Sequence, residues 1–293
     1  MKYLQLITIT LFISACSSKK HIIEAPKQEV IKEENVKVAK IEDPIIEQPK
    51  PFETVSEVVK ILEDTIGKIS EPKIQKKTKT PFNHNSWNIL LQKYVSNQGR
   101  VNYKGFNNDK KSLINYITLL SENIPYDSWT KNEKLAYWIN AYNALTIDLI
   151  LRNYPVESIK DIKNPWEQRL WKLGNKWYNL EDIEHQILRK MNEPRIHFAI
   201  VCASFSCPKL QNEAFTAKDL ERQLTNATKD FLNDSNRNEI SENNIKLSKV
   251  FQWFSKDFKQ NESLIEFLNL YSAVTISEKA KKSFKDYNWD LND

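Results

Sequence analysis

Residues 130–153 read TKNEKLAYWINAYNALTIDLILRN and form the stretch that decides the fold. Thr130 and Glu133 have the spacing of a capping box, in which two side chains satisfy free backbone amides at the start of a helix. Pro155 cannot continue a helix and disfavours helical geometry at the residue before it. The sequence therefore predicts a helix over residues 131–153. Its apolar residues lie on nearly every face, so we expect it to be the buried centre of the domain.

Shorter periodic segments surround this helix. An apolar stripe predicts an amphipathic helix over residues 110–122, and Gly174 indicates the turn of a hairpin within residues 170–180. These elements lack the alternating order of a parallel α/β sheet. They predict an α+β fold: a single domain with a long buried central helix, several amphipathic helices and a small mixed or antiparallel sheet. The other predicted elements are helices over residues 86–94, 181–189, 216–232, 249–257 and 263–271 and a hairpin over residues 239–247.

Residues 195–202 (RIHFAIVC) give the clearest strand pattern. If side chains alternate between the two faces, Cys202 lies on the same face as Ile196, and His197 lies on the opposite face. A strand here would end at Cys202 and lead into a loop of small residues.

The large aromatic residues mark the limits of the folded domain. All eight Trp residues lie after residue 80, as do most of the Tyr and Phe residues. Because large aromatics dominate core burial, the globular domain is expected at residues 81–293. The net charge of the whole chain is only +5, and the domain contains no run of Lys or Arg. This charge distribution predicts no nucleic-acid partner.

Residues 16–80 are rich in Lys, Glu, Pro and short aliphatic residues and nearly free of aromatics. Such a segment buries too little apolar surface to offset the entropy of ordering, so we expect a polar tether. Residues 52–69 are an exception, because apolar residues recur there at alternating spacings of three and four. This stripe predicts a short helix. It would either dock on the domain or on a second copy of the chain, or remain solvated.

The first 15 residues have the plan of a secretory signal. Lys2 supplies a positive charge, and residues 4–13 form an apolar run that is too short to span a bilayer. The run ends at Ala15-Cys16, which resembles the lipobox of bacterial lipoproteins. Ordinary signal cleavage beside an incidental cysteine is the alternative.

The lipobox resemblance implies cleavage before Cys16, a diacylglyceryl thioether on its sulfur, and an acylated new N-terminus with chains such as palmitate. Several acyl chains exceed what stable membrane attachment requires. The membrane would then be a partner of the chain through Cys16. Ser17 is not Asp, which by resemblance to lipoprotein sorting rules favours the outer membrane of the bacterial envelope.

Several motifs within the domain resemble the domain-of-unknown-function 547 family. They occur in the order that the family has them and extend over roughly residues 85–293. The resemblance implies a domain whose activity has no assignment, and it extends more reliably to the first cysteine of the loop than to the second. The motifs are WINAYNA (138–144), YPVESIK (154–160), IEHQILR (183–189), PRIHFAIVCAS (194–204) and YNWDLN (287–292).

Cys202 is the candidate nucleophile of this domain. A thiol at a strand end, beside the amides of a small-residue loop, could attack an acyl or amide carbon and have its oxyanion held by those amides. His185 is the candidate base, because His197 is expected on the opposite face. Asn140 and Asn143, which are polar residues in an apolar helix, are candidates for orienting the imidazole, as an Asn does in papain-like proteases.

Structural interpretations stand beside each of these roles. In an oxidising compartment, Cys202 and Cys207 could form a disulfide, or remain inert core thiols. His185 could be a satisfied structural histidine, and the two Asn side chains could hold loop backbone. The spacing of Cys and His matches no zinc motif, and Gly is scarce, so no metal and no cofactor are predicted.

Two classes of function follow. The first is a non-catalytic envelope module that binds a glycan, a peptide or a protein partner, with Arg189, Arg195 and Glu184 as candidate binding residues. The second is a cysteine-dependent acyl transferase or amide hydrolase that uses Cys202 and His185. This enzymatic function requires the side chains of Cys202 and His185 to line one solvent-accessible cavity.

Overall fold

The computed structural model describes residues 81–259 and 263–293. The expected signal peptide (1–15), the expected lipidation of Cys16 and the predicted helix over residues 52–69 all lie outside the described residues. Internal contacts divide the chain into residues 1–74 and 75–293, and the described residues belong to the second unit.

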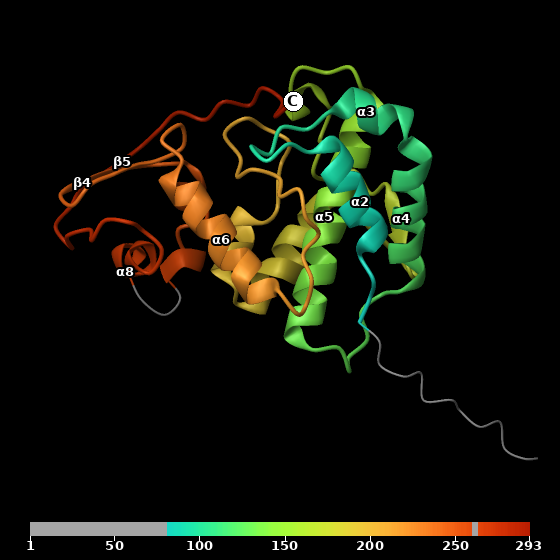
Figure 1. Cartoon of the computed structure of the whole chain (residues 1–293), viewed down its shortest axis with the longest axis horizontal. Helices are drawn as coiled ribbons and strands as arrows, with labels where there is room; N and C mark the ends of the chain where they lie inside the picture. Colours follow the sequence, from blue (N-terminus) through green and yellow to red (C-terminus); the bar gives the residue numbers. More distant parts are fainter. Residues whose placement is uncertain (1–80, 260–262) are drawn as a thin grey trace, which may run out of the picture. The chain divides into compact units, whose positions relative to one another are not determined.

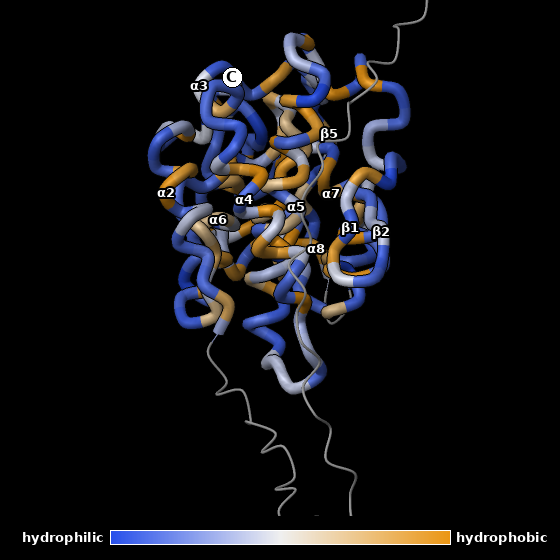
Figure 2. The backbone as a smooth tube through the Cα atoms, turned by 90° about the vertical axis from the view of Figure 1, so that its right-hand side faces the viewer, coloured by the Kyte–Doolittle hydropathy of each residue, from blue (hydrophilic) through white to orange (hydrophobic). Residues whose placement is uncertain are grey.

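Helix α5 (Lys131–Asn153) has the limits that the sequence predicts (Figure 1). The capping box is formed: the Thr130 hydroxyl accepts from the Glu133 amide, and the Glu133 carboxylate accepts from the Thr130 amide. All residues from 135 to 151 are buried, which confirms a central helix covered on every side. Figure 2 shows the hydrophobic residues gathered along this interior and the polar residues along the outer loops.

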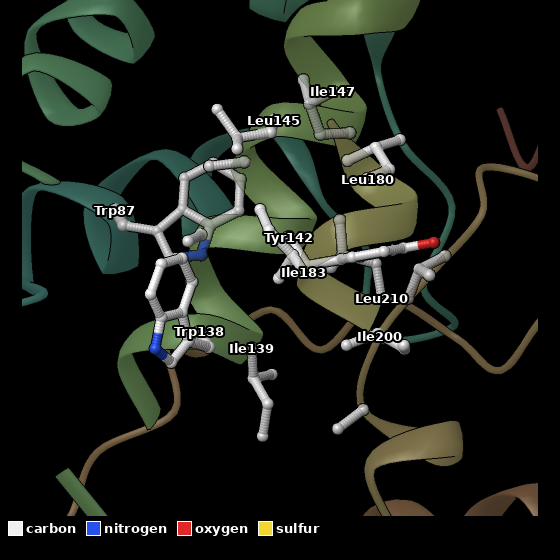
Figure 3. Packing of buried hydrophobic residues seen from close by; sticks show 14 of the residues in the cluster. Trp87, Trp138, Ile139, Tyr142, Leu145, Ile147, Leu180, Ile183, Ile200 and Leu210 are labelled. Atoms are coloured by element: carbon white, nitrogen blue, oxygen red, sulfur yellow. The ribbon is translucent and has the colours of Figure 1, made fainter. Parts of the chain in front are cut away.

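The first core lies between α5 and three helices that precede it, α2 (Asn85–Tyr94), α3 (Tyr103–Asn108) and α4 (Lys110–Glu122). The limits of α4 are those predicted from its apolar stripe. Trp87 of α2 stacks on Tyr116 of α4 with ring centroids 5.5 Å apart. Figure 3 shows Trp87 and Trp138 within the packing around α5.

A second core is built largely from the C-terminal half of the described chain, around Phe198, Phe251 and Phe258. A three-stranded sheet belongs to this half. β3 pairs with β4 in the antiparallel sense, as the predicted hairpin requires, and β4 pairs with β5 in the parallel sense, so the sheet is mixed. The elements are α6 (Leu220–Asn233), β3 (Glu239–Ile240), β4 (Asn244–Leu247), α7 (Val250–Trp253), η5 (Asp257–Lys259), α8 (Leu264–Asn269) and β5 (Lys281–Phe284).

The predicted hairpin at Gly174 is confirmed. Strands β1 (Trp171–Leu173) and β2 (Lys176–Tyr178) are antiparallel and form a separate two-stranded sheet. Gly174 has φ +60°, which favours glycine, and a Cβ there would lie 2.9 Å from Ile124. With its helices and two small sheets, the domain is an α+β fold, as predicted.

The prediction of a strand over residues 195–202 is wrong. Residues Pro194–Phe198 form a 3₁₀ helix, η4, which begins with Pro194 in the first turn and a hydrogen bond from the Arg195 amide to the Glu193 carboxylate. Alternation fails as a signal here because residues 195–201 are all buried, on both sides of the backbone. Two short helical turns precede η4: the π-helical η2 (Asp182–Ile187) and the 3₁₀ helix η3 (Leu188–Met191).

Residues 287–292 form a C-terminal strap that joins distant parts of the domain. The Leu291 amide donates to the Glu157 carbonyl, and the Phe205 amide donates to the Asp290 carbonyl. The strap thus lies between the segment after α5 and the loop after η4, and it brings its aromatic side chains to that loop. Within the described residues, no helix combines the length and apolar character that crossing a bilayer requires.

Candidate functional site

A cavity of about 190 Å³ lies beside the loop that follows η4. Its walls come from α5, η2, η4, α7 and the C-terminal strap, so it collects residues between positions 142 and 289. Six aromatic residues line it, together with one carboxyl group, two imidazoles and both cysteines of the loop: Tyr142, Trp166, Trp253, Phe254, Tyr287 and Trp289, then Glu184, His185, His197, Cys202 and Cys207.

A larger hollow of about 500 Å³ lies between residues 97–100 and α6, and it is lined mainly by polar side chains. None of the candidate residues from the sequence reaches it. We therefore place the candidate site in the smaller, aromatic cavity, where His185, Glu184 and Cys202 meet.

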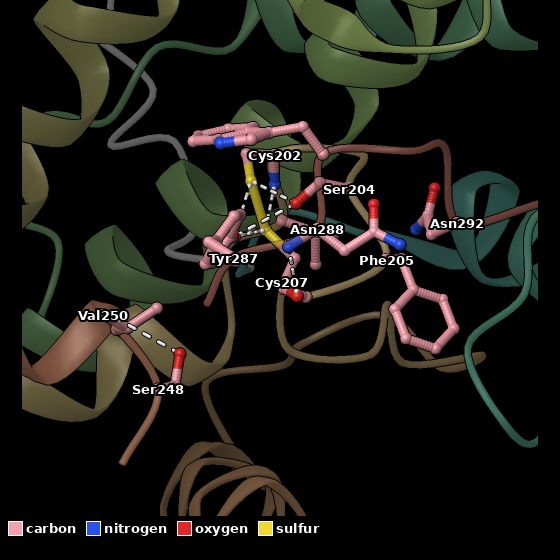
Figure 4. Close-up of a disulfide and its surroundings, with 12 residues drawn as sticks. Cys202, Ser204, Phe205, Cys207, Ser248, Val250, Tyr287, Asn288 and Asn292 are labelled. Atoms are coloured by element: carbon pink, nitrogen blue, oxygen red, sulfur yellow. Dashed lines mark hydrogen bonds between the residues drawn. A yellow bond between two sulfur atoms is a disulfide. The ribbon is translucent and has the colours of Figure 1, made fainter. Parts of the chain in front are cut away.

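Cys202 and Cys207 form a disulfide, with their Cα atoms 6.3 Å apart (Figure 4). Cys207 is buried and Cys202 is partly exposed. Two hydroxyl groups lie beside the sulfur atoms: the Ser204 oxygen is 3.2 Å from Cys202 Sγ, and the Tyr287 oxygen is 3.3 Å from each sulfur. In this state the sulfur of Cys202 is not a free thiol.

The two histidines lie on the same cavity, contrary to the expectation that His197 faces away from Cys202. The reason is that η4 is a helical turn, in which neighbouring side chains do not alternate between two faces. His197 is buried and stacks on Phe254 with centroids 4.0 Å apart. Burial lowers the pKa of His197, although Asp257 opposes this effect.

Asp257 joins His197 and Arg189. The Arg189 guanidinium donates from Nε and Nη2 to the two Asp257 oxygens at 2.6 and 2.7 Å, and Asp257 Oδ2 lies 2.8 Å from His197 Nε2. Burial alone would raise the pKa of Asp257, but the hydrogen bonds from Arg189 and His197 outweigh it and hold the pKa below its usual range. Asp257 therefore stays ionised and fixes both partners.

The same Arg189 donates from Nη1 to His185 Nδ1 at 2.8 Å. A guanidinium has no acceptor, so Nδ1 must accept and the neutral imidazole carries its proton on Nε2. Burial lowers the pKa of His185, and the charge of Arg189 lowers it further. His185 is thus held neutral, as a donor through Nε2. Arg189 is engaged by both partners and does not line the cavity.

Glu184 is the only carboxyl group among the residues that line this cavity, and it is almost fully buried. Its Oε2 accepts a hydrogen bond from the Tyr142 hydroxyl at 3.1 Å. Burial raises the pKa of Glu184 to about 7, with the hydrogen bond from Tyr142 acting in the opposite direction. Near neutral pH this group can therefore either donate or accept a hydrogen bond toward a ligand.

Asn140 and Asn143 do not orient His185. The Asn140 amide donates to the Phe215 carbonyl and accepts from the Phe215 amide, at 2.7 and 3.0 Å. Asn143 donates to the Ala199 carbonyl and accepts from the Val201 amide, both at 2.9 Å. Both side chains thus bond to backbone groups that have no strand partner. Their role is to hold loop backbone, the structural alternative given above.

Arg195 is also engaged elsewhere. Its guanidinium bonds to both oxygens of Glu193 and both oxygens of Glu221, at 2.6–2.8 Å. The hydrogen bonds that Arg195 donates to these carboxylates, to Glu193 first, raise its pKa. A guanidinium that is paired twice has little capacity for an anionic ligand, and Arg195 does not line the aromatic cavity.

The aromatic wall is a connected set of rings. Trp289 lies 5.9 Å from Trp166, 5.8 Å from Trp253 and 4.5 Å from Tyr287, measured between ring centroids. Tyr287 and Trp253 are 4.8 Å apart. Trp253 is 46 % exposed, so it forms the accessible rim of the wall.

Sequence reasoning missed Asp257 and most of this wall. Asp257 falls at the end of a predicted helix with no motif around it, so only the tertiary structure brings it to His197. Tyr287 and Trp289 did carry a signal, because they belong to the YNWDLN motif (287–292). Trp166 and Trp253 carried none.

Residues 126–232 match a family model described as "Protein of unknown function, DUF547". This segment carries the DUF547 pattern. It contains α5, Glu184, His185 and the disulfide, whereas Asp257, Trp253 and the strap lie beyond it. No curated protein and no solved structure matches the chain. Within residues 81–259 and 263–293, no three His, Cys, Asp or Glu side chains are grouped to hold a metal ion.

Proposed function

We propose that this chain is a lipid-anchored protein of the bacterial cell envelope whose domain binds a glycan without catalysing a reaction. The observation that carries the binding proposal is the ring wall formed by Trp253, Tyr287 and Trp289 beside Glu184. Ligand sites are typically concave, mostly apolar and supplied with a few placed polar groups, and this cavity fits that description.

A sugar ring suits this wall for a chemical reason. A pyranose has an apolar face of C–H groups that can lie on an indole or phenol ring, while its hydroxyl groups point outward from the edge. Glu184 can accept or donate to such a hydroxyl, and His185 can donate through Nε2. A volume of about 190 Å³ is below the usual range for drug-sized ligands, so we expect one sugar unit to enter at a time.

Two features favour binding over catalysis. Glycoside hydrolysis ordinarily uses two carboxyl groups that flank the bond, and Glu184 is the single carboxyl group on the described cavity wall. Cysteine-dependent catalysis needs a thiolate, and the sulfur of Cys202 is bonded to Cys207.

A titration of the full chain with soluble oligosaccharides of N-acetylated amino sugars, followed by tryptophan fluorescence and calorimetry, tests the proposal. We expect wild type to bind and Trp253→Ala to bind about ten-fold more weakly, because it removes a stacking surface. Trp177→Ala is the matched control, since Trp177 is similarly exposed at 53 % but lies on β2, away from the cavity. Absence of binding by wild type, or equal losses in both variants, would refute glycan binding.

The cysteine-dependent reaction is the second candidate, and one observation favours it. Cys202 and His185 line the same cavity, which is the arrangement that such chemistry requires. After an external thiol has reduced the disulfide, the Cys202 thiolate would attack an acyl or amide carbon, expel the protonated alcohol or amine and leave a thioester, which water or an acceptor amine would then cleave to release Cys202. His185 would first have to exchange its bond with Arg189, because its Nδ1 is engaged and its Nε2 carries the proton.

An activity-based thiol probe distinguishes the two candidates. Under reducing conditions, labelling of wild type that is lost in both Cys202→Ser and His185→Ala would favour the reaction. An absence of labelling in folded, reduced wild type would exclude the cysteine-dependent reaction and would not affect the glycan-binding proposal.

The envelope location rests on the lipobox resemblance at Cys16. Metabolic labelling with a palmitate analogue, followed by membrane fractionation, tests it: wild type should be labelled and membrane-bound, and Cys16→Ala should lose both properties. Ser17→Asp is the test of the outer-membrane expectation. It should keep the label and shift the protein toward the inner membrane. Labelling of Cys16→Ala at the wild-type level would contradict the anchor.

A further inference from the structure

Both residues of the Cys202–Cys207 disulfide line the aromatic cavity, where a small molecule can approach. Cys202 is the more accessible partner, because it is partly exposed whereas Cys207 is only 4 % exposed. Because Cys202 is the more exposed, an attacking group would reach Cys202 Sγ first, and Cys207 Sγ would be the leaving sulfur. A disulfide that only stabilises a fold does not require a cavity beside it.

Cys207 Sγ already accepts two hydrogen bonds. The Cys202 backbone amide donates to it over 3.0 Å, and the Tyr287 hydroxyl donates to it over 3.3 Å. The Ser204 hydroxyl in turn donates to the Tyr287 oxygen at 3.0 Å, which leaves the Tyr287 proton directed to sulfur. Donors to an anionic acceptor bind more strongly than donors to a neutral one, so both bonds would strengthen if Cys207 became a thiolate.

The loop that carries Cys207 is held from outside the cavity. Arg237 donates from Nε to the Cys207 carbonyl at 2.6 Å and from Nη2 to the Phe205 carbonyl at 2.5 Å. The amides of Phe205 and Ser206 donate to the strap at Asp290 and Asn288. These bonds do not involve the sulfur atoms, so the loop would keep its shape after the S–S bond breaks.

We propose that Cys202–Cys207 is an exchangeable disulfide that oxidises low-molecular-weight thiols entering the aromatic cavity. This activity goes beyond glycan binding and does not depend on it. The cavity volume of about 190 Å³ suits a small thiol and excludes a folded protein.

The exchange has two steps. An incoming thiolate forms a bond to Cys202 Sγ, the Cys202–Cys207 bond breaks, and its electron pair remains on Cys207 as a thiolate held by Tyr287 and the Cys202 amide. A second thiolate then attacks the external sulfur of the mixed disulfide and releases Cys202 as a thiolate. Two external thiols are thereby oxidised to one disulfide, and the protein gains the two electrons.

The rate of this exchange can be measured on the full chain with reduced glutathione as the probe. Samples taken at intervals are alkylated, and the modification of Cys202 and Cys207 is read by peptide mass spectrometry. We expect the disulfide of the folded protein to react about ten-fold faster than the same disulfide in urea, because the leaving thiolate finds its donors in place. A slower reaction in the folded protein than in urea would overturn the proposal.

Substitutions test the roles of the individual groups. Tyr287→Phe keeps the ring and removes one donor, so exchange should slow by about ten-fold. Tyr126→Phe, at an exposed tyrosine that does not line the cavity, is the matched control and should react as wild type does. Equal rates in Tyr287→Phe and wild type would refute the role of the hydroxyl and, with it, the proposed leaving group.

Trapping identifies the attacked sulfur. With oxidised glutathione, Cys207→Ser should form a mixed disulfide at Cys202 at least about ten-fold faster than Cys202→Ser forms one at the buried Cys207. An adduct formed equally fast at Cys207 would overturn the assignment. Circular dichroism of each variant establishes that the comparison is made between folded proteins.

Discussion

Glu184 shows how a carboxyl group buried at the candidate site can cost stability. Its carboxyl group is nearly surrounded by protein and has one hydrogen-bond donor, Tyr142, among the contacts described above. Burial disfavours its charged form, which is the reason that its pKa rises to about 7. Functional groups are commonly found in such environments, because a pKa near neutrality lets one group both accept and donate.

This pKa predicts a pH-dependent stability. Between pH 4.5 and 7 the folded protein holds a proton that the unfolded chain has released, so the contribution of Glu184 is complete below pH 4.5 and is lost as the pH rises through 7. Glu184→Gln stays neutral and should therefore be more stable than wild type above pH 7, by up to about 3 kcal/mol. Urea denaturation at pH 4 to 8 measures the difference.

The exposed Glu167→Gln serves as the control and should follow the wild-type pH curve. If the free energy of unfolding of Glu184→Gln has the same pH dependence as that of wild type, Glu184 does not have the raised pKa that its burial implies. The free energy of unfolding of wild type must be subtracted from that of the variant at each pH. The lowered pKa values of His185 and His197 make stability rise with pH, which is opposite to the effect of Glu184.

At the scale of elements, local signals predict the helices well and the site less well. The capping box and the apolar stripe fix α5 and α4 to the residue, because both signals act within a few turns. The 195–202 segment is not a strand, because its backbone hydrogen bonds are made within its own helical turn, to the Ile196 carbonyl, and to the Asn143 side chain. No rule of local periodicity can detect a partner 56 or 58 residues away.

The same limit applies to the candidate site. Cys202, His185 and Glu184 were identified from chemistry and motifs, and they do lie on one cavity. Asp257, which binds and positions His197 and Arg189, comes from a different element and has no sequence signal. Motifs and side-chain chemistry in one sequence identify reactive residues, but they do not identify the residues that position them.

Asn143 offers a test of this explanation for the loop after η4. Its amide is buried and bridges the Ala199 carbonyl and the Val201 amide. Asn143→Ala leaves two buried backbone groups without partners and should lower the free energy of unfolding by about 2–4 kcal/mol. Asn153→Ala is the control on the same helix, because Asn153 is exposed and bonds only to the Leu149 carbonyl. Similar losses in the two variants would contradict the bridging role.

At the scale of the whole molecule, the C-terminal strap ties the domain together. Leu291 belongs to the first core and is 7 % exposed, although the helices of that core lie more than a hundred residues earlier. The strap also supplies Tyr287 and Trp289 to the cavity. The site and the stability of the domain therefore share this segment.

Leu291→Ala should lower the free energy of unfolding by about 2–3 kcal/mol, because it removes buried apolar surface and leaves a cavity. Leu270→Ala is the matched control: Leu270 is 64 % exposed, and its loss should cost less than about 0.5 kcal/mol. Urea denaturation followed by tryptophan fluorescence measures both. A loss at position 291 no larger than that at position 270 would mean that the strap does not dock as described.

The strap also bears on the order of events during folding. The Tyr103 hydroxyl donates to Asn292, 189 residues along the chain, whereas the contacts within α5 close over three or four residues. Bringing such remote segments together carries a loop-closure entropy that local contacts avoid, and proteins rich in remote contacts fold more slowly. The helices around α5 should therefore assemble early and the strap should join last. A chain in that intermediate stage would have its native helices, yet no pocket to offer a ligand.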